Sequence, residues 1–421
     1  MEIIADLHLH SKHSRATSKN LDFENLEKYA KIKGVNLLGT GDFCHPIWNK
    51  EIKTKLHEKD NGTLVSKTGF PFILTNEISL IYTQNNKGRR VHLVLLAPNL
   101  AVVDQITEYL LKHGRIDYDG RPIFKITCED FTYELKKISK DIEVIPAHIW
   151  TPWFSMFGSK SGFDTVKECF GDQTKHIHAI ETGLSSDPPM NWRLSQLDKF
   201  SILSFSDAHS FWPWRLGREA TLFDIDLTYK NLIKSIKTQQ GLIGTIEVDP
   251  NYGKYHIDGH RNCNISMHPQ ESIKHKGICP VCKKPLTIGV LYRVEELADR
   301  PFGFTPPNPK KFHSLIPLSE LISAVKGGAV ATKKVQAEFF NLVNGRSEYD
   351  VLLRMPEEEL LKLTEKKLVE TILLNRVGKI KIKPGFDGVY GIPLIEGVEI
   401  KNELASQPAQ KGLMDFVNQG D

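Results

Sequence analysis

Histidines and carboxylates recur in the first half of the chain at positions where short apolar runs end. His8 and His10 flank Leu9, and an alternating pair on an extended strand points both imidazoles to one face, where they can share a metal ion. Many strands carry two histidines without a metal, so the pair gains weight only from similar residues elsewhere. Those residues are Asp42, Glu77, His92, His148, Asp207 and His209.

Mixed imidazole and carboxylate ligands are typical of Zn, Mn or Fe sites, and a carboxylate can bridge neighbouring ions. Closely spaced ions lower the pKa of bound water and stabilise the attacking and leaving oxygens in phosphoryl transfer. The alternative for each histidine is a hydrogen-bonded structural role. The recurrence at strand ends favours a metal-dependent phosphoesterase centre over a set of unrelated histidines.

Strands and helices alternate along this half of the chain, which predicts parallel strands that could close into an α/β barrel. Helices are predicted over Phe23–Lys33 and Ala101–His113. In such barrels functional side chains lie at the carboxyl ends of strands. The predicted strands are Ile3–Leu9, Val35–Thr40, Phe72–Ile78, Val91–Ala97, Ile142–Ala147, Ala179–Glu181, Ser201–Ser206 and Ala220–Phe223.

The order His-x-His, Gly-Asp, Glu then His, Ala-His and Ser-Asp-Ala-His resembles the polymerase-and-histidinol-phosphatase (PHP) superfamily. The resemblance implies a distorted seven-stranded α/β barrel that holds two or three divalent ions, Zn, Mn or Mg, for phosphoester hydrolysis. It implies that Glu77 is the bridging carboxylate and that Asp207, Glu77 and His148 are catalytic. The ligands it implies are His8, His10, Glu77, His92, His148, Asp207 and His209.

The chain departs from the superfamily pattern at Phe43, which follows Gly41-Asp42 where many members carry a histidine. A phenylalanine cannot bind a metal. Either Asp42 or His45 fills that ligand position, or one ion is held weakly.

A second metal site is predicted from Cys279 and Cys282, a C-x2-C knuckle, together with Cys263. Four soft ligands in tetrahedral geometry make a structural zinc site. The fourth ligand is His260 or His268, and we favour His260 because its two-residue spacing from Cys263 matches the other knuckle. The alternative is a pair of reduced cysteines on a turn.

Downstream of the cysteines, residues 293–301 read Arg-Val-Glu-Glu-Leu-Ala-Asp-Arg-Pro, which resembles the archaeal and bacterial endonuclease Q subfamily of PHP proteins. The resemblance then covers essentially the whole chain. It implies a DNA-repair enzyme that cuts 5′ of deaminated bases (hypoxanthine, uracil, xanthine) and of abasic sites. Two alternatives remain open: a small-molecule phosphatase of the histidinol-phosphatase type, and a catalytically inactive scaffold that binds DNA.

These expectations divide the chain into a barrel (1–247), a zinc-binding module (248–305), a C-terminal helical region that binds DNA (306–400) and a flexible tail (401–421). Base or phosphate contacts are expected from aromatic and basic residues near the barrel mouth. The tail resembles a sliding-clamp binding motif, with Leu413 and Phe416 on one face of a helical turn. The residues concerned are Tyr82, Trp153, Trp214 and Arg215 for DNA, and Gln410, Leu413 and Phe416 for the clamp.

Composition narrows the setting of this chemistry. The formal net charge is only +4, so nucleic-acid binding must rely on local basic patches. No apolar run is long enough to cross a bilayer, and no signal peptide is visible at the N-terminus. We therefore expect a cytoplasmic protein, without a membrane partner and monomeric.

Overall fold

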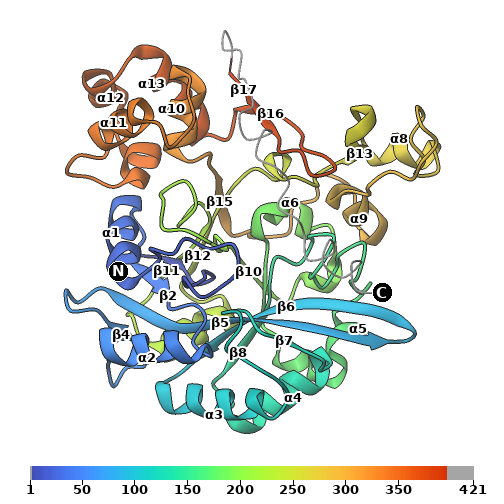
Figure 1. The fold of residues 1–421 in the computed structure, drawn as a ribbon. Helices are drawn as coiled ribbons and strands as arrows, with labels where there is room; N and C mark the ends of the chain where they lie inside the picture. The colour runs from blue at the N-terminus through green and yellow to red at the C-terminus, as the bar shows by residue number, and fades with distance from the viewer. Residues whose placement is uncertain (1, 396–421) are drawn as a thin grey trace.

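The computed structural model describes residues 2–395, and its centre is a mixed sheet (Figure 1). Every strand region predicted above contains a strand. The sheet has eleven strands within the described residues: β1 (Glu2–Asp6), β2 (Leu37–Gly39), β3 (His57–Glu58), β4 (Leu64–Val65), β5 (Pro71–Gln84), β6 (Lys87–Ala97), β7 (Ile123–Phe124), β8 (Glu143–Pro146), β11 (Ala220–Asp224), β12 (Leu242–Glu247) and β15 (Lys311–Ser314).

The alternation of strands and helices predicted parallel strands, but the strands of this sheet are not all parallel. β1 pairs in parallel with β2 and antiparallel with β11, while β6 pairs antiparallel with both β5 and β8. Asn85 and Asn86 both have positive φ, the conformation of a two-residue hairpin turn, and they fold β6 directly back along β5. The predicted barrel stays a prediction, because in residues 2–395 no strand pair joins β9 (Ala179–Glu181) and β10 (Ser201–Leu203), themselves a parallel pair, to the large sheet.

Helices cover the sheet and extend beyond it. The first, α1, begins where the Asp22 side chain accepts the N–H of Asn25 and ends at Gly34, whose φ of 98° is the left-handed helix stop that glycine adopts readily. The helices are α1 (Phe23–Lys33), α2 (Pro46–Lys55), α3 (Leu100–Leu111), α4 (Cys128–Ile138), α5 (Val166–Phe170), α6 (Pro188–Asn191), α7 (Tyr229–Thr238), α8 (Pro269–Lys274), α9 (Val290–Leu297), α10 (Leu318–Lys326), α11 (Lys333–Leu342), α12 (Glu357–Leu363) and α13 (Lys366–Arg376).

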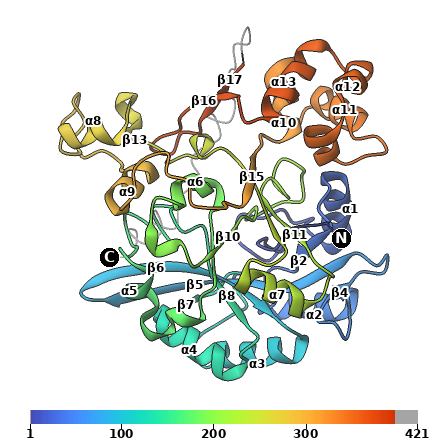
Figure 2. The same ribbon diagram turned by 180° about the vertical axis from the view of Figure 1, so that it is seen from behind.

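Helices α10 to α13 form a group beside α1, away from the sheet's lower helices (Figures 1 and 2). A buried ion pair joins the group to α1, with Lys33 Nζ 2.8 Å from Glu348 Oε1. In the same group, α12 ends at Leu363 and α13 begins at Lys366. The basic run after α13 is extended and pairs as β16 (Lys381–Lys383) with β17 (Ile392–Leu394).

Short strands and helical turns build the segment that carries the cysteines. It lies at the opposite upper corner from α10 to α13 in both ribbon views. Its elements are β13 (Asp258–His260), η5 (Arg261–Cys263), β14 (Ile265–Met267), α8 and α9. Elsewhere in the described residues, the remaining short helices are η1 (Gly171–His176), η2 (Gly183–Ser185), η3 (Ser195–Leu197), η4 (Pro250–Tyr252) and η6 (Asp350–Arg354).

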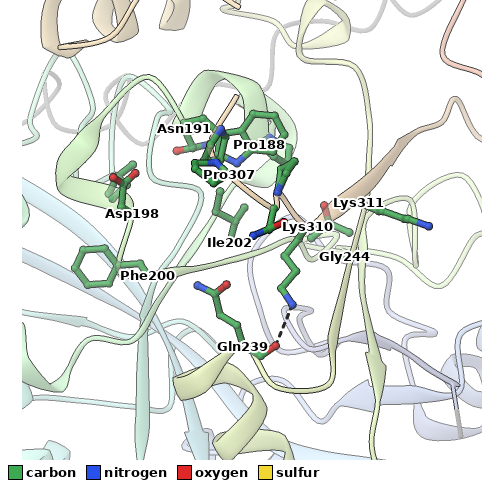
Figure 3. A pocket seen from close by; sticks show the side chains of 16 residues that line it. Pro188, Asn191, Asp198, Phe200, Ile202, Gln239, Gly244, Pro307, Lys310 and Lys311 are labelled. Atoms are coloured by element: carbon green, nitrogen blue, oxygen red, sulfur yellow. Dashed lines mark hydrogen bonds between the residues drawn. The ribbon is translucent and has the colours of Figure 1, made fainter. Parts of the chain in front are cut away.

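The proline-rich linker that precedes β15 lies over α6 and β10 and encloses a pocket of about 360 Å³ (Figure 3). Prolines and apolar side chains make up much of its wall. Of its two lysines, Lys310 and Lys311, the first is already engaged, since Lys310 Nζ donates to the carbonyl oxygen of Gln239 at 3.1 Å. The linker therefore packs against the sheet rather than spanning a gap.

Among the helices of residues 2–395, none combines the length and the apolarity that a bilayer crossing requires.

Candidate metal centres

Glu77 lies in the middle of β5, and its two carboxylate oxygens face two different sets of side chains. Oε2 is 3.2 Å from His10 Nε2 and 3.5 Å from His8 Nε2. Oε1 is 2.6 Å from His92 Nδ1 and 3.2 Å from His148 Nε2. A carboxylate placed in this way can bridge two ions, one held on each side.

The first set is completed by Asp207, which approaches from the loop after β10. Its Oδ1 is 3.1 Å from His10 Nε2 and 3.6 Å from His8 Nε2. The ligand atoms of His8, His10, Glu77 and Asp207 lie within 4.8 Å of one another, and the same holds for those of Glu77, His92 and His148. The structure thus brings six of the predicted ligands into two groups that share Glu77.

The chain segment after β1 holds the first histidines in place. β1 ends at Asp6, so His8 and His10 follow the strand instead of lying on it. Leu9 forms a parallel bridge with Ala208, and the His10 N–H donates to the carbonyl oxygen of Ala208 at 3.0 Å. This bridge fixes the first motif against the Asp207 loop, although the two are far apart in sequence.

Two carboxylates orient the imidazoles from behind. Glu181 lies 2.9 Å from His8 Nδ1 and also accepts the backbone N–H of His148 at 2.7 Å. Asp42 Oδ1 is 3.1 Å from His10 Nδ1, and its Oδ2 accepts the N–H of Ser11 at 2.6 Å. A carboxylate on the far ring nitrogen fixes the tautomer and raises the basicity of the nitrogen that faces a metal.

The remaining predicted ligands lie near these groups but not within them. Asp42 was expected as a ligand, yet its oxygens are directed at His10, Ser11 and Ser14, so it supports a ligand instead. His209 lies beside His10 with ring centroids 4.5 Å apart and the rings tilted at 57°. The alternative residue His45 stacks on His13, with ring centroids 4.5 Å apart, and belongs to neither ligand group.

Three residues of the centre adopt a backbone conformation that side chains other than glycine's rarely take. The φ angles of Asp42, His148 and Asp207 are 44°, 30° and 47°. Each comes just after a short strand or strand-like run. Such conformations cost about 1–3 kcal/mol each and persist where the surrounding structure imposes them, often at functional sites.

The carboxylates make the centre strongly attractive to cations. Burial lowers the pKa of His8, but the charges of Glu181 and Glu77 outweigh it and raise that pKa well above its ordinary value. Burial raises the pKa of Asp207, but His209 and His10 pull it well below the usual range. His92 differs, because burial lowers its pKa to about 4 and leaves a neutral imidazole, the form that binds metals.

Buried nitrogen atoms without partners show that divalent ions fit these groups. His8 Nε2 and His92 Nδ1 have no hydrogen-bond partner among the described residues, although both face Glu77. A buried polar atom left in this state costs about 1–3 kcal/mol. Ligation to a metal would satisfy both atoms and would suit the mixed imidazole and carboxylate donors.

Two functional residues escaped the sequence reasoning. Glu181 ends β9, one of the predicted strands, and that position was the signal that could have identified it. Arg121 gave no comparable signal, because it lies in a turn after α3. Its Nη1 donates to Glu77 Oε2 at 3.0 Å, and its side chain is 24% exposed, so it lies between the centre and solvent.

The cysteine segment forms a second group. The ligand atoms of His260, Cys263, Cys279 and Cys282 lie within 4.8 Å of one another, with His260 Nδ1 3.4 Å from Cys282 Sγ. His268 instead stands at the residue before α8 and belongs to no ligand group. The N–H groups of Cys282 and Val281 help to lower the pKa of the Cys279 thiol to about 7. Three thiols and one imidazole are the donor set that tetrahedral zinc prefers.

Comparison with known proteins identifies the family. Residues 317–379 match the family model described as the MJ0043 C-terminal domain. The crystal structure of the lesion-specific endonuclease PfuEndoQ from Pyrococcus furiosus is similar over the full length of both chains, with 32% sequence identity and a TM-score of 0.83. The chain belongs to the endonuclease Q family.

Two further proteins are similar to this chain over different shares of their lengths. A crystal structure of endonuclease Q in complex with a 27-mer duplex substrate, with an abasic lesion at the active site, has 32% identity, a TM-score of 0.83 and covers 97% of this chain and 99% of that one. The protein MJ0043 of Methanocaldococcus jannaschii is 34% identical over 292 residues, which are 67% of this chain. This endonuclease Q family member matches only 35% of the length of MJ0043.

The residues of this endonuclease Q family member that were expected to contact DNA lie in different surroundings. Tyr82 is only 5% exposed and packs towards Phe163, so the structure does not support the expected DNA contact at this position. Trp214 is also buried, stacked on Trp212 with ring centroids 5.1 Å apart.

Trp153 and Arg215 connect the centre's loops to later parts of the chain. The half-buried Trp153 ring meets Tyr255 edge to face at 5.8 Å, so its loop contacts the cysteine segment. Arg215 Nη1 is 3.8 Å from Glu320 Oε1 on α10. The clamp motif of Gln410, Leu413 and Phe416 lies outside the described residues.

Proposed function

We propose that the protein is a metal-dependent DNA-repair endonuclease, which hydrolyses the phosphodiester bond 5′ of deaminated bases (hypoxanthine, uracil, xanthine) and of abasic sites. The observation that carries the proposal is Glu77, with one oxygen directed at His8 and His10 and the other at His92 and His148. The likeness to an endonuclease Q bound to an abasic duplex supports DNA as the substrate.

The ligand groups suggest how the reaction is divided among residues. His8, His10 and Asp207 would hold one ion with Glu77, and His92 and His148 would hold a second. Divalent ions bound here would lower the pKa of a water molecule and stabilise charge on the phosphate oxygens. Zn, Mn and Mg all remain compatible with these donors.

The chain's own groups orient the reaction. Glu181 and Asp42 fix the His8 and His10 rings so that one nitrogen of each faces Glu77. Arg121, partly exposed beside Glu77, would bind the phosphate of the scissile bond through its fixed pair of donors. Asp207, Glu77 and His148 remain the proposed catalytic residues, since each would contact the reacting atoms or the ions.

Parts of the chain beyond the barrel region 1–247 supply the features that a small phosphate ester would not need. We assign residues 248–305 to a module held by zinc and residues 306–400 to a region that helps to hold DNA. The contact of Trp153 with Tyr255 and that of Arg215 with Glu320 tie both to the loops of the metal centre. This argues against the histidinol-phosphatase alternative.

The test is a cleavage assay on 5′-labelled duplexes that carry a single hypoxanthine, uracil or abasic site, with Mg or Mn. A product cut immediately 5′ of the lesion is expected, and an undamaged duplex should stay intact. Release of phosphate from small esters without DNA cutting would establish the phosphatase instead. Binding of the duplex with neither activity would establish the inactive scaffold.

Asp207→Ala tests the assignment of the centre in the same assay. The variant should lose cutting and largely keep DNA binding, because the Asp207 carboxylate is directed at His8 and His10 and supplies no positive charge for phosphates. Asp60→Ala, an exposed aspartate in a turn, is the matched control and should cut normally. Full activity of Asp207→Ala would refute the ligand assignment.

The tail adds a proposed partner. Gln410, Leu413 and Phe416 would bind the hydrophobic pocket of a sliding clamp. Deletion of residues 410–421 should abolish binding to the clamp in a pull-down and leave lesion cutting unchanged. Retained clamp binding after the deletion would dismiss this role.

A further inference from the structure

A strongly basic pocket of about 430 Å³ lies among α4, η1 and the end of α7. It contains five lysines and no acidic side chain in its lining. The lining residues are Tyr133, Lys136, Lys137, Lys140, Gln173, Lys175, His176, His178 and Lys237.

The pocket is at the opposite end of the strands from the metal centre. β8 begins at Glu143, beneath the pocket, and the chain reaches His148 only after this strand has ended. His178 likewise precedes β9, whose last residue, Glu181, supports the metal ligands. Figure 1 places α4 below the sheet, away from the cysteine segment and α10 to α13. The pocket is therefore separate from the proposed site of DNA cutting.

The helix α4 directs one whole face at the pocket. Tyr133, Lys136 and Lys137 are spaced i, i+3 and i+4, which places them on a single side of the helix. Lys140 follows the end of α4, where the backbone is extended at Ser139. A face built in this way is more useful for holding an anion than for packing.

Local carboxylates neutralise only part of the charge. Glu143 Oε1 is 2.8 Å from His178 Nδ1, and its other oxygen is 3.9 Å from Lys237 Nζ. Glu134 pairs with Lys137 at 3.1 Å. Lys140 and Lys175, both exposed, have no ion pair within the described part of the chain.

Burial and neighbouring positive charges both act on the pKa values of two groups in the pocket. Burial and the neighbouring Lys237 lower the pKa of Lys136, although Glu143 opposes them. Burial and the charges of Lys136 and Lys175 lower the pKa of His176. A bound anion would relieve this repulsion, so the pocket is set up to gain free energy from one.

The rim of the pocket adds an aromatic platform. Tyr133 is 49% exposed, and the Lys137 ammonium lies 4.9 Å from the centre of its ring. A flat ring system of a ligand can stack on this exposed ring, next to the lysines that would attract its phosphates. The side-chain amide of Gln173, also in the lining, offers such a ligand one hydrogen-bond donor group and one acceptor.

The geometry points to a binding site for a nucleoside di- or triphosphate in this pocket. Lys140 and Lys175 would bind the phosphates, and the base would stack on Tyr133. Lys136 adds positive charge beside them while its ammonium donates to the carbonyl oxygen of Ile142. A volume of about 430 Å³ suits a small ligand, and a concave site favours one whose charges are close together over an extended backbone. The phosphates of duplex DNA are the alternative source of the same charge.

The test is calorimetric titration of the full-length protein, in excess Mg, with ATP and separately with inorganic tripolyphosphate. The double variant Lys140→Glu/Lys175→Glu should weaken both affinities about tenfold or more, since two attractive contacts become repulsive. The control Lys59→Glu/Lys67→Glu changes the net charge equally at exposed positions elsewhere and should bind like the wild type. Tyr133→Ala should weaken ATP binding and spare tripolyphosphate.

Several results would overturn the inference. These are the absence of ATP binding in the wild type, equal affinities of the two double variants, or an unchanged ATP affinity in Tyr133→Ala. A loss confined to binding of an undamaged duplex would assign the lysines to DNA instead. Lesion cutting by Lys140→Glu/Lys175→Glu at the wild-type rate would show that the variant is folded and that this site is distinct from the metal centre.

Discussion

Replacing Glu77 by glutamine tests the bridging role most directly, because the change keeps the shape of the side chain and removes its charge. The carboxylate has five close contacts, of which the contact with Arg121 at 3.0 Å involves a permanent charge. Two unit charges at that separation attract by about 5 to 6 kcal/mol at an effective dielectric constant of about 20, before desolvation is subtracted. We take about 4 kcal/mol of this attraction as the net loss of transition-state stabilisation once desolvation is subtracted. Such a loss corresponds to a fall in kcat of about 10³-fold.

The two sides of Glu77 make the expected result specific. Because each oxygen faces its own histidines, Glu77→Gln should weaken both ion sites together, and elemental analysis after dialysis should show fewer catalytic ions per chain. The assay is single-turnover cutting of a duplex with one hypoxanthine, with Mn from micromolar to millimolar. Glu370→Gln, at an exposed position of α13, is the matched control and should behave as the wild type. Retention of both ions and a rate within tenfold of the wild type would refute the bridging role.

Three further predictions address the support of the centre, the cysteine group and the buried acids. Glu181→Gln should lower metal affinity by about 10–100-fold and be rescued by high Mn, because it removes the carboxylate behind His8 without removing a ligand; a variant that excess Mn does not rescue would contradict this. Cys279→Ser should lose one zinc per chain by elemental analysis and lower Tm, and an unchanged zinc content would exclude Cys279 as a ligand. Burial raises the pKa of Glu247 to about 8, above its unfolded value near 4.5, so its folded form keeps a proton that the unfolded form loses. The free energy of unfolding should then fall by up to about 1.4 kcal/mol per pH unit between these values, and Glu247→Gln should show a shallower fall in urea titrations; parallel curves would refute it.

Local pattern was enough to predict the regions of eight strands, because strands follow from short-range apolar periodicity, and to single out the residues of the candidate metal groups. The mixed directions of the strands were not predictable in this way. The Asn85-Asn86 turn that reverses β6 against β5 stands in the polar stretch 83–90, and it is a local signal for this one antiparallel pair only. Strand direction depends on such turns, whereas the positions of His92 and Glu77 on the strands do not.

Tyr82 shows a prediction that the sequence itself could have corrected. It lies five residues after Glu77 on the uninterrupted strand β5, and successive side chains on a strand point to opposite faces. An odd separation therefore directs Tyr82 away from the face that carries Glu77. Arg121 is the opposite case, since only the tertiary fold brings its turn to the carboxylate.

The departure at Phe43 bears on how many ions the centre holds. Phe43 is fully buried and packs in the hydrophobic core, so that position is lost to ligation. Its neighbour Asp42 does not compensate, because one oxygen is committed to His10 and the other to Ser11 and Ser14. Asp42 is held there with a φ of 44°, a strained conformation that directs the carboxylate behind the His10 ring. The described residues thus offer two ligand groups joined by Glu77, and from them we infer two ions, with Asp42 serving the first by orienting His10.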